Sequence, residues 1–253
     1  MSDEVLVEYA GSTVVITINR PDAKNAINRA VTDGVADAIE ELEARPDLTV
    51  GILTGAGGNF SAGMDLRAFL AGEDLEHPRG LAGITIQPPH KPLIAAVEGW
   101  ALAGGCEIAL AADLIVAAND AKFGIPEVKR ALVAGGGGLL RLPRRIPSAI
   151  AMEIALTGDP LTAEQAFRYG LVNQLTEPGG ALTGARALAD RIAANGPLAV
   201  AATKEIVSHA LDWTIEEGFA KQDPIMRPVF ASDDAREGAL AFTEKRDPVW
   251  KGR

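Results

Sequence analysis

A short buried strand followed by a glycine-rich turn occurs twice in the middle of this chain, and this recurrence most constrains its fold. The segment "PDLTVGILTGAGGNFSAGMDL" gives a strand over residues 50–54, a glycine-rich loop and a helix start. The segment "KPLIAAVEGWALAGGCEIALAADLIV" gives a strand, a glycine-containing turn, an apolar helix and a second strand. Apolar runs of strand length between turn signals indicate buried strands. The recurrence therefore predicts an α/β core wound from similar turns.

The N-terminal segments predict a hairpin and then a helix. Residues 5–18 are mainly apolar around "AGST", which is typical of a β-hairpin. In the residues that follow, apolar side chains recur at helical spacing and predict one packed helix face, made of Ile27, Val31, Val35, Ala38 and Leu42.

From about residue 145 the sequence predicts mainly helices, because helix start and stop signals become frequent. Thr162 with Gln165, and Thr214 with Glu217, have the spacing of capping boxes. Gly170 follows the first of these helices as a stop signal.

A last helix is expected after Ser232 as its N-cap, with Lys245 and Arg246 in its final turn, where positive charge suits the helix dipole. The change from strands to helices divides the chain. We expect a core over residues 1–195 and a C-terminal helical region over residues 196–253.

Composition and charge limit the classes of partner that the protein is expected to bind. The formal net charge is −10, which disfavours a nucleic-acid backbone or an anionic membrane as a general partner. Cys106 is the single cysteine, so no internal disulfide and no cysteine-rich metal site can form. The N-terminal "MSDEVLVEYA" lacks the apolar region of a secretory signal, and no apolar stretch has the length of a membrane span. We expect a cytoplasmic protein.

Several common chemistries lack their residues. The three histidines, His77, His90 and His209, have no metal-ligand spacing. In "NFSAG", Asn59 stands where a hydrolase nucleophile elbow has glycine. The runs "GAGGNF" and "AGGGGLL" lack the Lys-Ser/Thr ending of a phosphate-binding P-loop. A metal site, a serine hydrolase and a nucleotide site are therefore all disfavoured.

The two glycine-rich turns, after residues 62 and 103, suggest a different use. A helix N-terminus presents unpaired N–H groups, and glycine lets a ligand oxygen approach them closely. Two such turns can each direct one N–H at a single oxygen and so stabilise an oxyanion. This arrangement predicts enolate or tetrahedral-intermediate chemistry at a carbonyl.

Glu107 lies in the first turn of the apolar helix "GGCEIALA". An ionised carboxylate without a partner costs several kcal/mol to bury. Glu107 therefore has a partner, reaches solvent, or serves chemistry; a first-turn carboxylate that only interacts with the helix dipole is the alternative. Asp113, at the end of the same run, is expected to be a structural cap or turn partner.

At this point several motifs together resemble the enoyl-CoA hydratase/isomerase (crotonase) family: "NFSAGMDL", "VEGWALAGGCEIALAADLIVA", "AKFGIPEV", "GGGGLLRLPR" and "FTEKRDPVWKGR". The resemblance covers nearly the whole chain. It implies a spiral of ββα units with a C-terminal helical trimerisation region, and a homotrimer or hexamer. It also implies an acyl-CoA thioester substrate and no separate cofactor, because coenzyme A is part of that substrate.

The resemblance implies the site residues position by position. The oxyanion donors fall on the backbone N–H groups of Met64 and Gly104, and the two catalytic glutamates on Glu107 and Glu127. In family members that hydrate a double bond, two glutamates flank one water. Two carboxyl groups in one apolar pocket cannot both ionise cheaply, so their pKa values should separate. One can then accept a proton from water while the other donates one to carbon.

The resemblance further implies a coenzyme A channel lined by Lys24, Ala26, Ala62, Met64, Asp65, Leu66, Arg67, Gly104 and Lys245. Lys245 is expected to approach the phosphates, from this chain or from a neighbouring subunit. For the lysines and Arg67 an ordinary surface position is the alternative, since single basic residues are usually solvated. Met64 is bulkier than the small residue often found there and can narrow the acyl pocket. Glu98, where many relatives carry asparagine, has no assigned role.

Four functions remain open. The leading hypothesis is an enoyl-CoA hydratase that adds water to a 2-enoyl-CoA to give a 3-hydroxyacyl-CoA. The segments "IALAADLIVAAND", "GGGLLRLPR" and "EKRDPVWKGR" also resemble carnitinyl-CoA dehydratase. An enoyl-CoA isomerase is a third possibility. A non-catalytic acyl-CoA-binding regulator is disfavoured, because a binding module has no use for a costly buried acid pair. Acyl-chain length, head group and pathway stay open.

Overall fold

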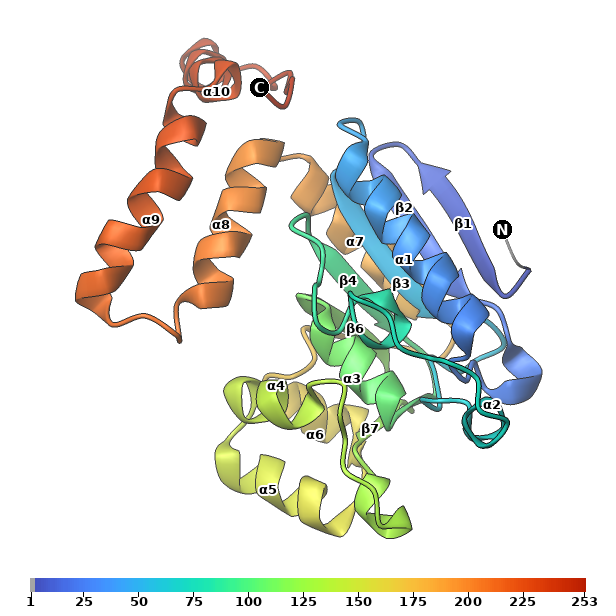
Figure 1. The fold of residues 1–253 in the computed structure, drawn as a ribbon. Coiled ribbons are helices and arrows are strands. Elements are labelled where there is room, and N and C mark those ends of the chain that lie inside the picture. Colours follow the sequence, from blue (N-terminus) through green and yellow to red (C-terminus); the bar gives the residue numbers. More distant parts are fainter. Residues whose placement is uncertain (1–2) are drawn as a thin grey trace.

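The computed structural model describes residues 3–253, which form a two-sheet core and a helical arm that extends to one side of it (Figure 1). None of the helices in this range is long and apolar enough to cross a lipid bilayer. The sheets hold the N-terminal and central parts of the chain, and the arm holds its C-terminal part.

The larger sheet has six strands in the order β1 (Val5–Ala10), β2 (Thr13–Ile18), β3 (Val50–Gly55), β4 (Leu93–Val97), β6 (Leu114–Ala118) and β9 (Gln174–Thr176). β1 and β2 pair antiparallel, which confirms the predicted hairpin. All other neighbours in this sheet are parallel. Helices cover both faces of the parallel part, so its strands are continuous apolar runs.

The smaller sheet contains β5 (Trp100–Leu102), β7 (Lys122–Gly124) and β8 (Leu161–Thr162). Ser61 extends it by one parallel bridge to Ala101 in β5. Successive turns of the chain thus place one segment in the larger sheet and the next in the smaller one. This arrangement is the expected spiral of ββα units, and it brings the two glycine-rich turns to neighbouring positions.

The helices follow in chain order, with three short 3₁₀ turns among them. The core contains η1 (Pro21–Ala23), α1 (Arg29–Ala44), α2 (Leu66–Leu70), η2 (Leu81–Gly83), α3 (Gly104–Ala111), η3 (Glu127–Arg130), α4 (Gly138–Arg145), α5 (Ser148–Thr157), α6 (Ala163–Arg168) and α7 (Ala181–Ala193). The arm contains α8 (Pro197–His209), α9 (Ile215–Phe230) and α10 (Asp233–Glu244). The division of the chain at residues 195 and 196 stays a prediction.

Successive side chains along the strands of the larger sheet belong alternately to two apolar clusters, one on each face. Val50 and Ile52 of β3 pack with α7 on one face, while Leu53 packs with α1 and α3 on the other. The alternation follows from the period of two in a strand. Burial of α3 between the sheet and α4 places its N-terminus, and with it Glu107, inside the core.

Most helix signals in the sequence are confirmed. The Thr162–Gln165 and Thr214–Glu217 capping boxes both form, and the Ser232 hydroxyl accepts the N–H of Ala235. In each, a side-chain oxygen satisfies one of the N–H groups that a helix start leaves unpaired.

Two boundary predictions are wrong. Ile27 lies before α1, because Asn28 is the N-cap, and Ile27 instead makes a parallel bridge to Met64. Lys245 and Arg246 do not lie in the last turn of α10. Lys245 is the C-cap with a φ of 55°, and Arg246 turns back to pair with Glu237. A left-handed residue ends a helix, so the positive charges fall beyond it.

Candidate active site

The N-terminus of α3 carries the N–H group predicted to be the first oxyanion donor and one of the predicted carboxyl groups. All eight residues of α3 are buried. Ala103, its N-cap, has a φ of 52°, a backbone conformation that costs a non-glycine residue free energy. This sharp entry directs the N–H of Gly104 away from the chain that precedes it. Gly105 must lack a side chain, since a Cβ there would lie 2.1 Å from the carbonyl oxygen of Ser61.

The second donor lies beside the first. A Cβ on Gly63, whose φ is +92°, would lie 2.7 Å from the nitrogen of Gly104, and one on Gly104 would lie 3.3 Å from the nitrogen of Met64. Within the described residues, neither the N–H of Met64 nor that of Gly104 donates a hydrogen bond to a main-chain or side-chain acceptor. The structure therefore brings together the two N–H groups predicted to share one oxygen.

The origin of the Met64 donor differs from the prediction. The first glycine-rich turn was expected to open an apolar helix, but α2 has only five residues, none of them buried, and Asp65 is its N-cap. Met64 precedes that cap and forms a bridge with Ile27. Its N–H thus belongs to an extended segment and not to a helix start, and it directly follows Gly63, whose positive φ favours glycine.

Glu107 is 3% exposed and has a main-chain partner. Its Oε1 accepts the N–H of Gly138 at 2.9 Å. Burial raises the pKa of Glu107 above its ordinary value, while the N–H groups of Gly138 and Gly136 and the charge of Arg141 oppose that rise. Hydrogen bonds to the charged form favour ionisation, so Glu107 retains the means to be a carboxylate.

Residues 135–138 are four consecutive glycines, here called the glycine loop, and Glu107 occupies the space beside two of them, Gly136 and Gly138. A Cβ on Gly136 would lie 2.6 Å from Oε2 of Glu107, and one on Gly138 would lie 2.9 Å from its Cγ. The sequence alone placed these glycines in a family motif and did not predict their contact with Glu107. Four consecutive glycines before a helix were the available signal.

Glu127 begins η3, directly after Pro126. Its Oε2 is buried and has no hydrogen-bond partner among the described residues. Burial raises the pKa of Glu127, and the negative charge of Glu107 raises it further. The main chain offers this carboxyl group less compensation than the glycine loop offers Glu107. Its own main-chain N–H and the charge of Arg130 oppose the rise in the pKa of Glu127, but within residues 3–253 its buried Oε2 lacks the main-chain partner that Oε1 of Glu107 has.

Cys106, next to Glu107, is not a nucleophile here. It is buried, and burial together with the charges of Glu107 and Glu127 raises the pKa of its thiol to about 12. Reactive cysteines need an accessible thiolate. No group of three or more His, Cys, Asp or Glu side chains in residues 3–253 is arranged to hold a metal ion.

Part of the predicted coenzyme A channel comes together. The carbonyl oxygen of Lys24 accepts the N–H of Ala62 at 2.9 Å. The Lys24 ammonium lies 3.7 Å from the ring centroid of Trp100, a cation–π contact. Ala26 lies two residues along the same loop, and its carbonyl oxygen accepts a guanidinium N–H of Arg20 at 2.6 Å.

The residues after Met64 divide into structural and exposed positions. Asp65 caps α2 through the N–H groups of Arg67 and Ala68 and pairs with Arg20 at 2.9 Å, which lowers the pKa of Asp65. Its side chain is therefore committed to the fold. Leu66 is 43% exposed, and the Arg67 side chain also lies at the surface.

Lys245 does not join this group within one chain. It ends α10, which extends from α9 at the far end of the arm, whereas α2 lies at the opposite end of the molecule (Figure 1). A role near the coenzyme A phosphates thus requires the Lys245 of a neighbouring subunit.

Two further acidic residues are structural. The Glu98 carboxylate accepts the N–H groups of Gly179 and Ala181 at 2.9 and 2.8 Å, and so caps the start of α7 from a distant loop. This contact gives the unassigned Glu98 a role. Asp113 accepts the N–H of Leu93 and pairs with Lys204 of α8 at 2.6 Å, as expected for a structural partner.

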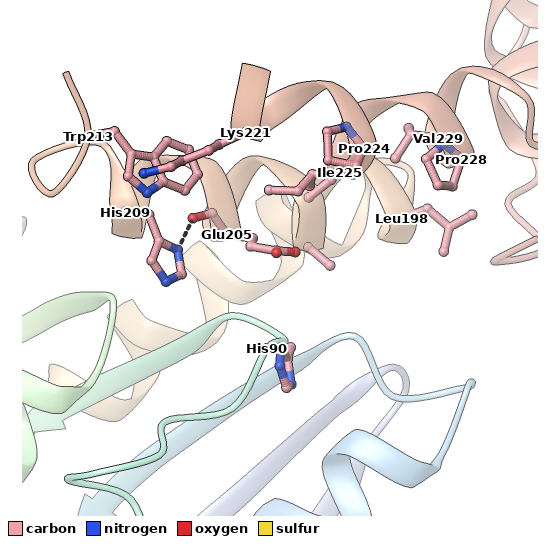
Figure 2. A pocket seen from close by; sticks show the side chains of 12 residues that line it. His90, Leu198, Glu205, His209, Trp213, Lys221, Pro224, Ile225, Pro228 and Val229 are labelled. Carbon is pink, nitrogen blue, oxygen red and sulfur yellow. Dashed lines mark hydrogen bonds between the residues drawn. The ribbon is translucent and has the colours of Figure 1, made fainter. Parts of the chain in front are cut away.

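A groove of about 690 Å³ lies between α8 and α9, away from Glu107 and Glu127, with His90 of the core below it (Figure 2). His209 stacks on Trp213 along its wall, with ring centroids 5.5 Å apart. Apolar side chains such as Leu198 and Ile225 form much of the remaining lining. The groove belongs to the arm and takes no part in the catalytic centre.

The adjacent N–H pair and the two buried carboxyl groups lie within a spiral of ββα units, and sequence comparison agrees with this architecture. The chain belongs to the enoyl-CoA hydratase/isomerase family, whose sequence model matches residues 8–253. The family comprises acyl-CoA enzymes, and the fold is the crotonase fold.

Individual relatives cover the entire chain. It is 44% identical to a carnitinyl-CoA dehydratase from Salmonella arizonae, with all of both chains aligned. Among solved structures, an enoyl-CoA hydratase from Mycobacterium marinum is 62% identical with a TM-score of 0.98. A carnitinyl-CoA hydratase from Mycobacterium avium is 43% identical with a TM-score of 0.80. Both structures align over 100% of each chain.

Proposed function

We propose that the protein is an enoyl-CoA hydratase, which adds water reversibly and syn to the double bond of a 2-enoyl-CoA and gives a 3-hydroxyacyl-CoA. The N–H groups of Met64 and Gly104 bind the thioester oxygen. As water adds to C3, negative charge moves onto that oxygen, and preorganised donors stabilise it there. A single donor of this kind is worth about 3 kcal/mol in the transition state.

The observation that carries the proposal is the unequal pair of buried carboxyl groups. Glu107, with main-chain donors and a nearby cation, is the ionised member and accepts a proton from the attacking water. Glu127, with a buried oxygen that lacks a partner, is the protonated member and donates its proton to C2. Water's oxygen forms the bond to C3. The proton gained by Glu107 and the one lost by Glu127 re-equilibrate through the next water.

The remaining predicted residues are assigned to substrate binding. Lys24, Ala26 and Ala62 form the side of the channel next to Trp100, and residues 64–67 form its rim. The acid–base steps use only groups of this chain, so we propose that no separate cofactor takes part. Lys245 contributes from a neighbouring subunit.

A second function is favoured by the relatives named carnitinyl-CoA dehydratase, which are 43–44% identical over the entire chain. That activity uses the same acid–base step on crotonobetainyl-CoA, whose acyl group carries a cationic head. Two Mycobacterium structures named enoyl-CoA hydratase are more similar than these relatives, at 62% identity. Simple 2-enoyl-CoA thioesters are therefore the first choice of substrate.

The test is a panel of 2-enoyl-CoA thioesters of increasing chain length, with crotonobetainyl-CoA included, assayed by loss of the conjugated double-bond absorbance. We expect hydration of simple enoyl-CoA thioesters with a clear preference over crotonobetainyl-CoA. A preference for crotonobetainyl-CoA would support the dehydratase function instead. Binding of every thioester without turnover would contradict both and favour a regulator.

The roles of the two glutamates are tested separately by exchange of the α-hydrogen of a 3-hydroxyacyl-CoA with deuterated solvent. Glu127→Gln should abolish exchange, because Glu127 moves the proton at C2. Glu107→Gln should retain more of it. Exchange that survives in Glu127→Gln but not in Glu107→Gln would reverse the assignment.

The protein is further proposed to be a homotrimer or a dimer of trimers and to act in the cytoplasm. Support for assembly comes from the arm, where large apolar side chains are exposed. Phe219 of α9 is 67% exposed and Phe242 of α10 is 85% exposed. Exposed apolar patches on this scale mark interaction surfaces.

A further inference from the structure

Arg141, in the first turn of α4, is a half-buried arginine that the acid–base steps above do not use. Its guanidinium donates to main-chain carbonyls and not to a carboxylate. Nη2 donates to the carbonyl oxygen of Thr85 at 2.6 Å, and Nη1 makes a longer contact to that of Gly136 at 3.4 Å. Burial of an unpaired cation is costly, and burial lowers the pKa of Arg141. Such a residue calls for an explanation.

The two carbonyl groups belong to segments that enclose the catalytic centre. Gly136 lies in the glycine loop, whose Gly138 N–H holds Glu107. A Cβ on Gly137 would lie 2.4 Å from Nη1 of Arg141, so the guanidinium packs directly against this loop. Thr85 lies in residues 79–86, here called the covering segment.

The covering segment also reaches the oxyanion turn. Cδ2 of Leu81 lies 2.6 Å from the position that a Cβ on Gly104 would take. Arg141 therefore connects the loop around the carboxylate to the segment over the oxyanion donor. The two segments lie 56 residues apart at the Arg141–Thr85 contact, and the Arg141 guanidinium makes no other hydrogen bond within residues 3–253.

Charge adds a second effect. The positive charge of Arg141 lowers the pKa of Glu107, and the charge of Glu107 in turn raises that of Arg141. The other ionisable groups around this pair are Cys106 on α3, Glu127 and Arg130 on η3, and Arg145 on α4. Of the cations around this pair in residues 3–253, Arg141 is the one whose charge lowers the pKa of Glu107.

We propose that Arg141 is a positioning residue for the general base: its guanidinium holds the glycine loop around Glu107 and supplies a positive charge to that side of the site before water is activated. The proposal rests on the hydratase function proposed above. Arg141 acts through Glu107 and the loop, and it does not contact the reacting atoms in this role.

The test compares the pH dependence of kcat/KM for crotonyl-CoA hydration in the wild type, Arg141→Met and Arg141→Lys. The ascending limb reports loss of the first proton from the carboxyl pair in the free enzyme. In Arg141→Met the midpoint of this limb should move to a higher pH by about one unit, because an opposite charge is removed from beside Glu107. At pH values below the midpoints of both limbs, kcat/KM should therefore fall roughly tenfold, the equivalent of one such unit.

Arg141→Lys keeps the positive charge but loses the fork that reaches two carbonyls. Its limb should stay near that of the wild type while kcat falls, which separates the electrostatic effect from the positional one. Arg144→Met is the matched control: Arg144 lies on the same helix but pairs with Asp212 at the surface, so neither limb nor kcat should change.

The outcomes are distinct. A wild-type enzyme that hydrates no enoyl-CoA refutes the proposed function before Arg141 is considered. If the wild type is active and folded Arg141→Met shows an unshifted limb, the proposal is wrong even where kcat is low, because a merely structural role lowers activity without moving the limb. Should Arg141→Met not fold by circular dichroism, Arg141→Gln, which can still donate to Thr85, must show the same shift; an unshifted limb there also overturns it.

Discussion

The carboxyl groups of the catalytic centre and those of the C-terminal arm are perturbed in opposite directions. Burial raises the pKa values of Glu107 and Glu127 in the core. In the arm, the Arg246 guanidinium and the Val249 N–H lower the pKa of Glu237 to about 2. In the first turn of α9, backbone and hydroxyl donors lower the pKa of Glu217 as well. Glu237 and Glu217 thus hold structure in the arm, whereas Glu107 and Glu127 are buried at a cost that the proposed acid–base role explains.

The helices of the core and of the arm also differ, in how much of each helix is buried. Every residue of α3 is buried, so tertiary packing defines it. α9 has no buried residue and depends on its capping box and on surface pairs such as Arg227 with Asp223. Ile215 of α9 is 82% exposed. In a single chain the core is therefore packed on itself, while the arm exposes the apolar surface on which the proposed trimer rests.

The largest effect is expected from removing either catalytic carboxyl group. Glu107→Gln and Glu127→Gln should each fold normally and each lose on the order of 10² to 10⁴ in kcat for hydration, the usual contribution of a general acid or base. Asp113→Asn, which alters a structural pair, is the control that should affect stability more than kcat. Near-normal turnover of crotonyl-CoA by either glutamine variant would remove that residue from the mechanism.

Substitutions on the apolar face of the arm should change the oligomeric state of the protein and not its catalytic rate. Phe219→Asp places a charge on the exposed apolar face of α9, so it should shift the protein toward monomer in sedimentation velocity at micromolar concentration. Phe219→Leu keeps the face apolar and should keep the assembly. A wild-type protein that sediments as a monomer at that concentration would contradict the trimer.

Opposite pH trends in stability should separate the two regions. The folded-state pKa of Glu127 is raised, so the contribution of Glu127 to the free energy of unfolding falls as pH rises from about 4 through that value. Glu127→Gln removes the loss, and its stability advantage in urea denaturation should grow between about pH 4 and pH 8. Similar advantages at both ends would show that the carboxyl is not perturbed.

Glu237 has a lowered folded-state pKa, about 2, so its contribution to stability is present above about pH 4 and is lost as pH falls. Glu237→Gln should therefore be less stable than the wild type at about pH 7, and the deficit should shrink toward about pH 3. A deficit that is constant over this range would mean that the Arg246 pair does not depend on the charge of Glu237.

The smallest effects are expected from the two capping boxes, one of which lies in the core and the other in the arm. Thr162→Ala and Thr214→Ala each remove a hydroxyl acceptor at a helix start, worth about 1 kcal/mol. In the core this loss should appear in the free energy of global unfolding. In the arm it should appear as faster hydrogen exchange at the start of α9. Equal losses in global unfolding, with exchange unchanged, would show that core and arm unfold as one unit.

The core of the fold was predictable because parallel strands buried on both faces are continuous apolar runs, as in β3 and β4. The capping boxes were predictable because their residues lie three apart. Ile27 was not, since its apolar spacing fits the helix equally well, and only the contact with Met64 decides its conformation. The end of α10 depends on a left-handed Lys245, which side-chain pattern does not specify.

The site was predictable where a motif fixed it and not where distant segments meet. Glu107 and Glu127 follow from motifs, and two glycine-rich turns pointed to paired N–H donors. The link from Arg141 to Thr85 has no local signal, because it joins a helix to a loop 56 residues away. The donor at Met64 was expected at a helix start but arises from an extended segment, because Asp65 begins the helix one residue later.

The most direct test of the account is a double-mutant cycle on the two glutamates, with kcat for crotonyl-CoA hydration measured in the wild type, Glu107→Gln, Glu127→Gln and the double variant. The account treats the two carboxyl groups as one unit that accepts and donates a proton around one water. It predicts that the double variant loses about as much as the more impaired single variant, far less than the product of the two losses. Losses that multiply would show that the two groups act independently, and would contradict the central claim.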